Sequence, residues 1–94
     1  MNHFTLHIAD YLRDTQQLSQ GQHGALMLLL NWYYAREKPL PNDLTVLCRV
    51  ASAYSPEEQA NLRFVLNYYF TLEADHCWHQ KRCDKEISAF QAAA

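Results

Sequence analysis

The sequence is short of glycine and of basic residues, and both shortages exclude classes of function. Its two glycines are Gly21 and Gly24, so it has no glycine-rich loop that could cradle a phosphate. Lysine and arginine number 8 against 10 acidic residues, which gives the 94 residues a formal net charge of −2 at pH 7. Because freestanding nucleic-acid binders usually carry a positive excess, this balance is a weak platform for gripping a polyanion.

Long apolar runs and paired cysteines are also missing. The longest apolar run covers residues 25–30, far below the roughly 18 residues of a membrane span. The first twenty residues lack the basic start and apolar block of a secretory signal. Cys48, Cys77 and Cys83 form an odd set without C-x-x-C spacing, which favours reduced thiols over a disulfide framework. We therefore expect a cytoplasmic protein without membrane contacts.

Apolar and aromatic residues are plentiful, at 49% and 13%, and predict one compact domain over residues 1–94. Residues 19–38 predict its central helix, since Asn31 is the one strongly polar residue between positions 25 and 35, and Ser19 with Gln22 forms a capping box. Steps of 100° predict a single exposed stripe made of Gln20, His23, Met27, Asn31, Tyr34 and Lys38. The opposite, buried side would carry Ala25, Leu26, Leu29, Trp32 and Tyr33.

Shorter elements are predicted on both sides of the central helix. Residues 4–8 alternate apolar and polar side chains, which indicates a short edge strand, and a single helical turn follows. Pro39 and Pro41 end the central helix and predict a short extended link. Asn42 or Asp43 can then cap a second helix that ends near residues 52–54.

The second half of the chain predicts a third helix, a hairpin and a last helix. Ser55 as N-cap, Pro56 as first helical residue and Glu58 as capping-box acid begin the third helix, which runs to about residue 70. Residues 70–80 predict a β-hairpin whose inward side chains are Phe70, Leu72 and Trp78. Asp84 would cap the last helix, which docks through Ile87 and Phe90.

The expected fold class is mainly α with a small β component. Three helices followed by a hairpin is the order of a winged helix-turn-helix, here with an extra N-terminal strand and an extra C-terminal helix.

Four stretches resemble a known family across nearly the whole chain. They are FTLHIADYLRDTQQLS near the start, HGALMLLLNWYYAREKPLP through the central helix, SPEE before the third helix and WHQKRCDKEI near the end. With these stretches the sequence resembles the YdaU family of phage and prophage proteins. The resemblance implies a winged-helix-like domain from a mobile element, with a role in initiating or controlling DNA replication. Many relatives continue past this domain, so we do not expect functions of their C-terminal half from a sequence ending at Ala94.

Two sets of side chains are candidates for DNA binding. In a winged helix the third helix would enter the major groove and the hairpin would touch the backbone. The candidates are Asn61, Arg63 and Asn67 on the third helix, and Lys81, Arg82 and Lys85 at the exit of the hairpin. Glu57 and Glu58 would repel phosphates, and Asp84 with Glu86 leaves the hairpin exit an excess of one positive charge. The pattern favours a solvated or partner-facing helix.

One cluster has the residue types of a zinc site, namely His76, Cys77, His79 and Cys83. Its spacing matches no common zinc finger, so packed cysteines and surface histidines are the favoured interpretation. Cys77 and His79 have no identifiable orienting acid or oxyanion donor for nucleophilic catalysis. We therefore expect no enzyme, no cofactor, no small-molecule substrate and no bound metal.

Aromatic side chains on predicted outer faces are the candidates for partner binding. Phe64 and Tyr68 lie four residues apart on the third helix, while Met27 and Tyr34 lie on the exposed stripe of the central helix. A contiguous apolar patch indicates a protein partner or self-association, unless the N-terminal strand or last helix covers it.

Our leading hypothesis is a non-enzymatic phage or prophage protein acting in DNA replication or its regulation through protein contacts, with weak DNA binding as an accompanying property. The alternatives are a sequence-specific DNA-binding regulator and, more distantly, a small zinc-binding module.

Overall fold

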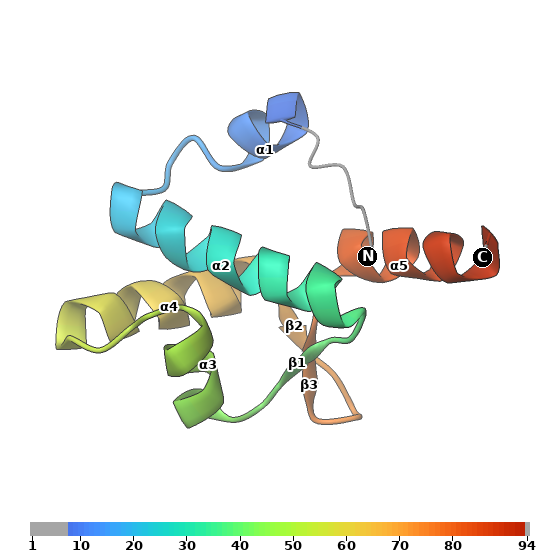
Figure 1. Cartoon of the computed structure of the whole chain (residues 1–94). Coiled ribbons are helices and arrows are strands. Elements are labelled where there is room, and N and C mark those ends of the chain that lie inside the picture. Colours follow the sequence, from blue (N-terminus) through green and yellow to red (C-terminus); the bar gives the residue numbers. More distant parts are fainter. Residues whose placement is uncertain (1–7, 94) are drawn as a thin grey trace.

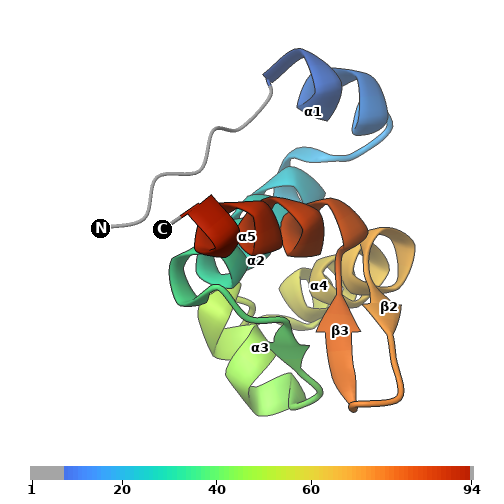
Figure 2. The ribbon, with the colours of Figure 1, turned by 90° about the vertical axis from the view of Figure 1, so that its right-hand side faces the viewer.

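A computed structural model describes residues 8–93 and has a mainly helical fold with one small antiparallel sheet (Figure 1). The elements of this described part are α1 (Ile8–Asp14), α2 (Gln20–Arg36), β1 (Leu40–Pro41), α3 (Leu44–Val50), α4 (Pro56–Tyr69), β2 (Thr71–Leu72), β3 (Cys77–His79) and α5 (Lys81–Ala93). The mainly α fold class with a small β component is therefore confirmed. In both views α1 lies at the opposite end of the molecule from the hairpin of β2 and β3 (Figures 1 and 2).

The central helix forms as predicted and organises the core. Ser19 is its N-cap, and the reciprocal capping box with Gln22 is present. Helix α2 packs mainly against α4 and makes smaller contacts with α3 and α5. Leu29 and Tyr33 of α2 and Leu62 and Val65 of α4 are completely buried between these elements. This burial removes apolar surface from water and holds the helices together.

The exposed side of α2 differs from the predicted stripe. Gly24 and Leu28 are exposed together with Asn31, whereas His23, Met27 and Tyr34 are half-buried. The cause is long-range, because the hydroxyl of Tyr11 in α1 reaches His23 and the carboxylate of Glu86 in α5 reaches Tyr34. Trp32, predicted in the core, is also half-buried, and the Arg36 guanidinium lies 4.0 Å from the centre of its ring.

The predicted extended link is the first strand of the sheet. The strand order is β1-β3-β2, and Trp78 in the middle strand pairs with Leu40 on one side and Leu72 on the other. The indole N–H of Trp78 also donates to the side-chain oxygen of Asn42, 3.1 Å away. Phe70 is buried as expected, but the inward placement of Leu72 was wrong, because that side chain is 43% exposed on an edge strand.

Local capping signals predict correctly where the next two helices begin, although α3 ends at Val50, before the predicted residues 52–54. Asp43 caps α3 by accepting hydrogen bonds from the N–H groups of Thr45 and Val46. Ser55 and Glu58 form the predicted capping box of α4, with Pro56 in its first turn. Both helices therefore begin at the predicted residues, which confirms these two predictions.

The last helix begins four residues earlier than predicted, at Lys81. The side-chain oxygen of Gln80 accepts the N–H of Cys83 at 2.7 Å, and its backbone carbonyl accepts the N–H of Asp84 at 3.0 Å. Gln80 thus takes the capping role that the sequence suggested for Asp84. Ile87 is buried as expected, whereas Phe90 is 38% exposed.

The predicted N-terminal strand falls on residues 4–8, of which 4–7 lie outside the described residues and Ile8 begins α1. The predicted helical turn after it is confirmed by α1. None of the helices in residues 8–93 is long and apolar enough to cross a membrane.

Candidate functional site

The outward side of α4 carries a shallow groove, which we call the α4 face, made of Ala60, Arg63, Phe64, Asn67 and Tyr68. The rings of Phe64 and Tyr68 stack with centroids 5.7 Å apart and an interplanar angle of 22°. Tyr69 continues the row, with its ring centroid 4.8 Å from that of Tyr68. Tyr68 is 62% exposed and Phe64 is half-buried. The structure thus joins the two predicted aromatic residues into one surface, although Met27 and Tyr34 lie elsewhere on α2.

The α4 face carries little of the chemistry that reads DNA. Arg63 is the one cation in the sequence of α4, whose first turn holds Glu57 and Glu58. The side-chain amide of Asn67 donates to the backbone carbonyl of Arg63 at 2.8 Å, so one of its donors serves the helix itself. Asn61 points toward α2, since a Cβ atom at Gly21 would lie 2.5 Å from its amide nitrogen.

The other three candidate DNA-binding residues lie on α5, which begins directly after the hairpin. Lys81 and Lys85 are exposed, while Arg82 forms ion pairs with Asp10 of α1 at 3.1 Å and with Glu86 at 2.9 Å. The guanidinium of Arg82 therefore links α1 to α5.

Two of the four candidate zinc ligands, His79 and Cys83, have other roles. Both ring nitrogens of His79 lie 2.7 Å from carboxylate oxygens, Nδ1 from Asp84 and Nε2 from Asp75. Cys83 is 1% exposed, and burial raises the pKa of its thiol to about 11, so it is not a thiolate at neutral pH. Among the residues described, no group of three or more His, Cys, Asp or Glu is arranged to hold a metal ion.

His79, Asp75, Asp84 and Tyr33 form a polar cluster that we call the His79 clamp. The Tyr33 hydroxyl donates to Asp84 and accepts the backbone N–H of Gln80 at 3.2 Å. Burial alone would lower the pKa of His79, but hydrogen bonds to Asp84 and Asp75 outweigh it and raise this pKa. Burial also raises the pKa of Tyr33, which stays a neutral donor. The clamp fixes the hairpin and α5 to α2. It could not be predicted from a local sequence pattern, because Tyr33 is far in the sequence from the other three residues.

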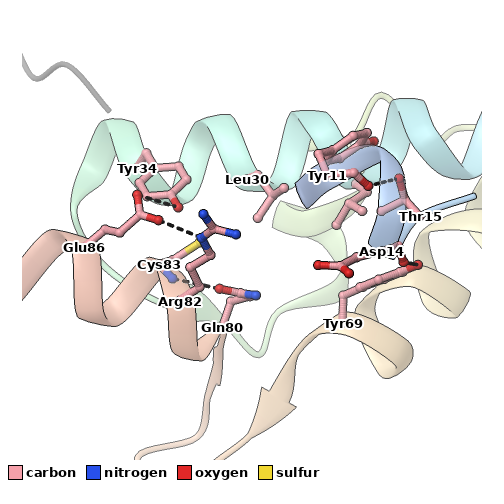
Figure 3. Close-up of a pocket in the computed structure, with 11 residues that line it drawn as sticks. Tyr11, Asp14, Thr15, Leu30, Tyr34, Tyr69, Gln80, Arg82, Cys83 and Glu86 are labelled. Atoms are coloured by element: carbon pink, nitrogen blue, oxygen red, sulfur yellow. Dashed lines mark hydrogen bonds and ion pairs between the residues drawn. The ribbon is translucent and has the colours of Figure 1, made fainter. Parts of the chain in front are cut away.

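A second concave site, which we call the α1–α5 pocket, opens between α1 and α5 with a volume of about 100 Å³ (Figure 3). Leu26 and Leu30 of α2 form an apolar floor, and Figure 3 shows Leu30 and the carboxylate of Asp14 directed into the space between the two helices. Arg82 and Gln80 approach from the side of α5.

Helix α1 forms one wall of this pocket and is held in place by polar contacts. The Tyr11 hydroxyl lies 2.8 Å from Nδ1 of His23, and the Tyr69 hydroxyl donates to the backbone carbonyl of Asp14 at 3.1 Å. Arg82 supplies the ion pair to Asp10 described above. Leu12 is 56% exposed, and none of the α1 side chains that the structure describes is fully buried. The sequence did not single out this pocket, because its walls come from four distant segments.

Comparison with known proteins identifies the family. The chain matches the family model described as "Protein of unknown function (DUF1376)" over residues 2–88 and belongs to that family. It is also 33% identical over 85 residues to a protein of Escherichia coli (strain K12) named "Uncharacterized protein YdaU". That alignment covers 89% of this chain and 28% of the Escherichia coli protein. The resemblance to the YdaU family is confirmed. No solved structure matches the chain.

Proposed function

We propose that the chain is a non-enzymatic, winged-helix-like cytoplasmic domain of phage or prophage origin that acts in DNA replication or its regulation through protein contacts. The α4 face is the contact surface in this proposal. The role in replication rests on the family resemblance, and the mode of action rests on the chemistry of α4.

The topology supports the winged helix-turn-helix assignment. The elements from α2 to β3 follow the order helix, strand, helix, helix, strand, strand, and the strand between the first two helices pairs with the last strand of the hairpin. In such a domain α4 occupies the place of the recognition helix. A surface on this helix is therefore where a partner is expected.

The observation that carries the proposal is the stacked pair of Phe64 and Tyr68 on an exposed helix with one cation. Aromatic side chains are enriched at the centres of protein interfaces, whereas DNA-binding surfaces depend on Lys and Arg to neutralise phosphates. A recognition helix with two acids, one arginine and a row of rings fits a protein better than a duplex.

Self-association is the simplest contact to test. We expect sedimentation velocity at high protein concentration to show association that weakens in a Phe64→Ser/Tyr68→Ser variant. Leu72→Ser is the matched control, because Leu72 is also an exposed apolar side chain but lies on the hairpin. A monomer at high concentration, or equal association in the double variant, would contradict self-contact through the α4 face.

The second candidate is a sequence-specific DNA-binding regulator, favoured by exposed Arg63 at the centre of α4. This candidate requires affinity that falls steeply with salt and drops when Arg63, Lys81 and Arg82 become alanine. The absence of binding to duplex or single-stranded DNA at low salt would exclude it.

A further inference from the structure

The α1–α5 pocket has about the size of one side chain. Its volume of about 100 Å³ exceeds the roughly 30 Å³ that one liquid water occupies and is below the roughly 150 Å³ of an apolar cavity that binds benzene. Its floor, Leu26 and Leu30, is apolar. A space of this size fits the apolar part of a single side chain.

The charges around the pocket favour a cation at its mouth. Asp10, Asp14 and Glu86 face two arginines, Arg13 and Arg82, which leaves one excess negative charge. Arg82 is bound on both sides by Asp10 and Glu86, and Arg13 by Asp10 and Asp14. The bond from Arg13 occupies Oδ1 of Asp14, which leaves its Oδ2 oxygen without a partner among the described residues.

The pocket walls also suit a cation with an apolar stem. Tyr11, Tyr34 and Tyr69 all line it, and tyrosine rings attract cations through their negative faces. Lysine places an alkyl chain on apolar surface while its ammonium group stays at the rim. The Arg13 contact leaves one oxygen of Asp14, which suits the compact ammonium group of lysine better than the planar guanidinium of arginine, whose fork matches both oxygens of a carboxylate.

We propose that the α1–α5 pocket receives the side chain of a lysine from a protein partner. Its alkyl chain lies on Leu26 and Leu30, and its ammonium group binds the carboxylate of Asp14. The inference rests on the proposed function, because it names the chemistry of one protein contact, but it uses a surface other than the α4 face.

Two capped amino acids test the inference on the whole chain. N-acetyl-lysine methylamide supplies the proposed side chain, and N-acetyl-norleucine methylamide has the same alkyl chain without the ammonium group. In NMR titrations we expect both to shift resonances of the pocket residues, with lysine bound about two- to fivefold more tightly, as for a solvent-exposed ion pair. The preference should shrink as salt is added.

Two variants test whether Asp14 causes the tighter binding of the lysine probe. Asp14→Asn should remove it, whereas Glu73→Gln, which neutralises an exposed acid of the hairpin turn, should retain it. Equal binding of the two probes, a preference that survives Asp14→Asn, or shifts outside the pocket would overturn the inference. Lysine binding should also persist in Phe64→Ser/Tyr68→Ser. Failure of the probe with intact α4-dependent association removes the pocket inference alone, and the reverse result removes the α4 proposal alone.

Discussion

At the scale of the residue, neighbouring side chains of α2 have opposite roles. Leu29 is 0% exposed in the core, and Leu28 beside it is 40% exposed. We expect Leu29→Ala to lower the free energy of unfolding by about 2–5 kcal/mol, because it leaves a cavity among packed side chains. Leu28→Ala should change it by only about 0.5 kcal/mol. Urea unfolding measures both, and equal losses would contradict the observed orientation of α2.

The loss expected for Leu29→Ala is large relative to the total free energy of unfolding of a small protein. Small domains are stable by roughly 5–15 kcal/mol, so loss of function in Leu29→Ala would report unfolding and not a missing contact. Functional substitutions should therefore be made on exposed residues such as Tyr68 and Asp14.

The His79 clamp predicts a defined dependence of stability on pH. Because the folded-state pKa of His79 is raised above its ordinary value of 6.5, the clamp stabilises the fold fully below that value. This stabilisation is lost as pH rises through the raised pKa. At acidic pH the clamp loses stability through Asp75. The hydrogen bond from His79 lowers the pKa of this carboxyl, so the stabilisation that Asp75 contributes is lost as the pH falls below 3.8, the ordinary pKa of aspartate.

We therefore expect the midpoint temperature of thermal unfolding to decrease as the pH is raised from 6 to 8.5. The decrease should be smaller in His79→Gln. His76→Gln is the control, since His76 is exposed in the hairpin turn and has no hydrogen bond from its ring among those of the described residues. A His79→Gln variant with the wild-type pH dependence would show that the clamp is not the titrating group.

At the scale of the element, helix beginnings depend on local hydrogen bonds. Ser55 accepts the N–H of Glu58, while the N–H groups of Ser55 and Tyr54 hold the Glu58 carboxylate and lower its pKa. We expect Ser55→Ala to destabilise the protein by about 1 kcal/mol, the usual cost of losing an N-cap. Ser88→Ala, at an exposed position inside α5, should not destabilise it. Chemical denaturation compares the two, and equal effects would refute the capping role.

Such local signals explain which elements could be predicted from the sequence. The beginnings of α2, α3 and α4 follow from Ser19, Asp43 and Ser55, each of which acts within three residues of itself. The pairing of Leu40 with Trp78 joins positions far apart in the chain, so the prolines indicated only an extended link. For the same reason Asp84 looked like a cap, although it accepts hydrogen bonds from Tyr33 and His79.

Of the two candidate sites, the one formed within a single helix could be predicted from the sequence, and the one formed by distant segments could not. Phe64 and Tyr68 are one helical turn apart, so their stacking could be predicted from the sequence of α4 alone. The α1–α5 pocket needs Asp14, Leu30 and Arg82 to meet from three helices, which periodicity within one segment cannot reveal. Tyr34 was predicted on an exposed stripe because nothing within α2 indicates that α5 covers it.

At the scale of the whole molecule, the central helix α2 packs against the helices that carry two separate surfaces. The α4 face presents stacked rings, and the α1–α5 pocket presents an apolar floor with a carboxylate at its mouth. The α4 face carries one cation, Arg63, and the pocket has an excess of negative charge, so neither surface has the cluster of Lys and Arg that binding to a polyanion would require. We therefore propose protein contacts, and not DNA contacts, as the main activity of this protein.

Capture of partners from nuclease-treated extracts of lysogenic or infected cells tests this account most directly. Immobilised wild-type protein and the Leu72→Ser control should retain the same specific protein, and the Phe64→Ser/Tyr68→Ser variant should lose it. Because Phe64 is half-buried against the core, thermal unfolding must show that this variant is still folded at the temperature of the capture experiment. Retention of an identical set of proteins by all three, or capture that is seen in untreated extracts but not in nuclease-treated ones, would contradict a protein contact through the α4 face.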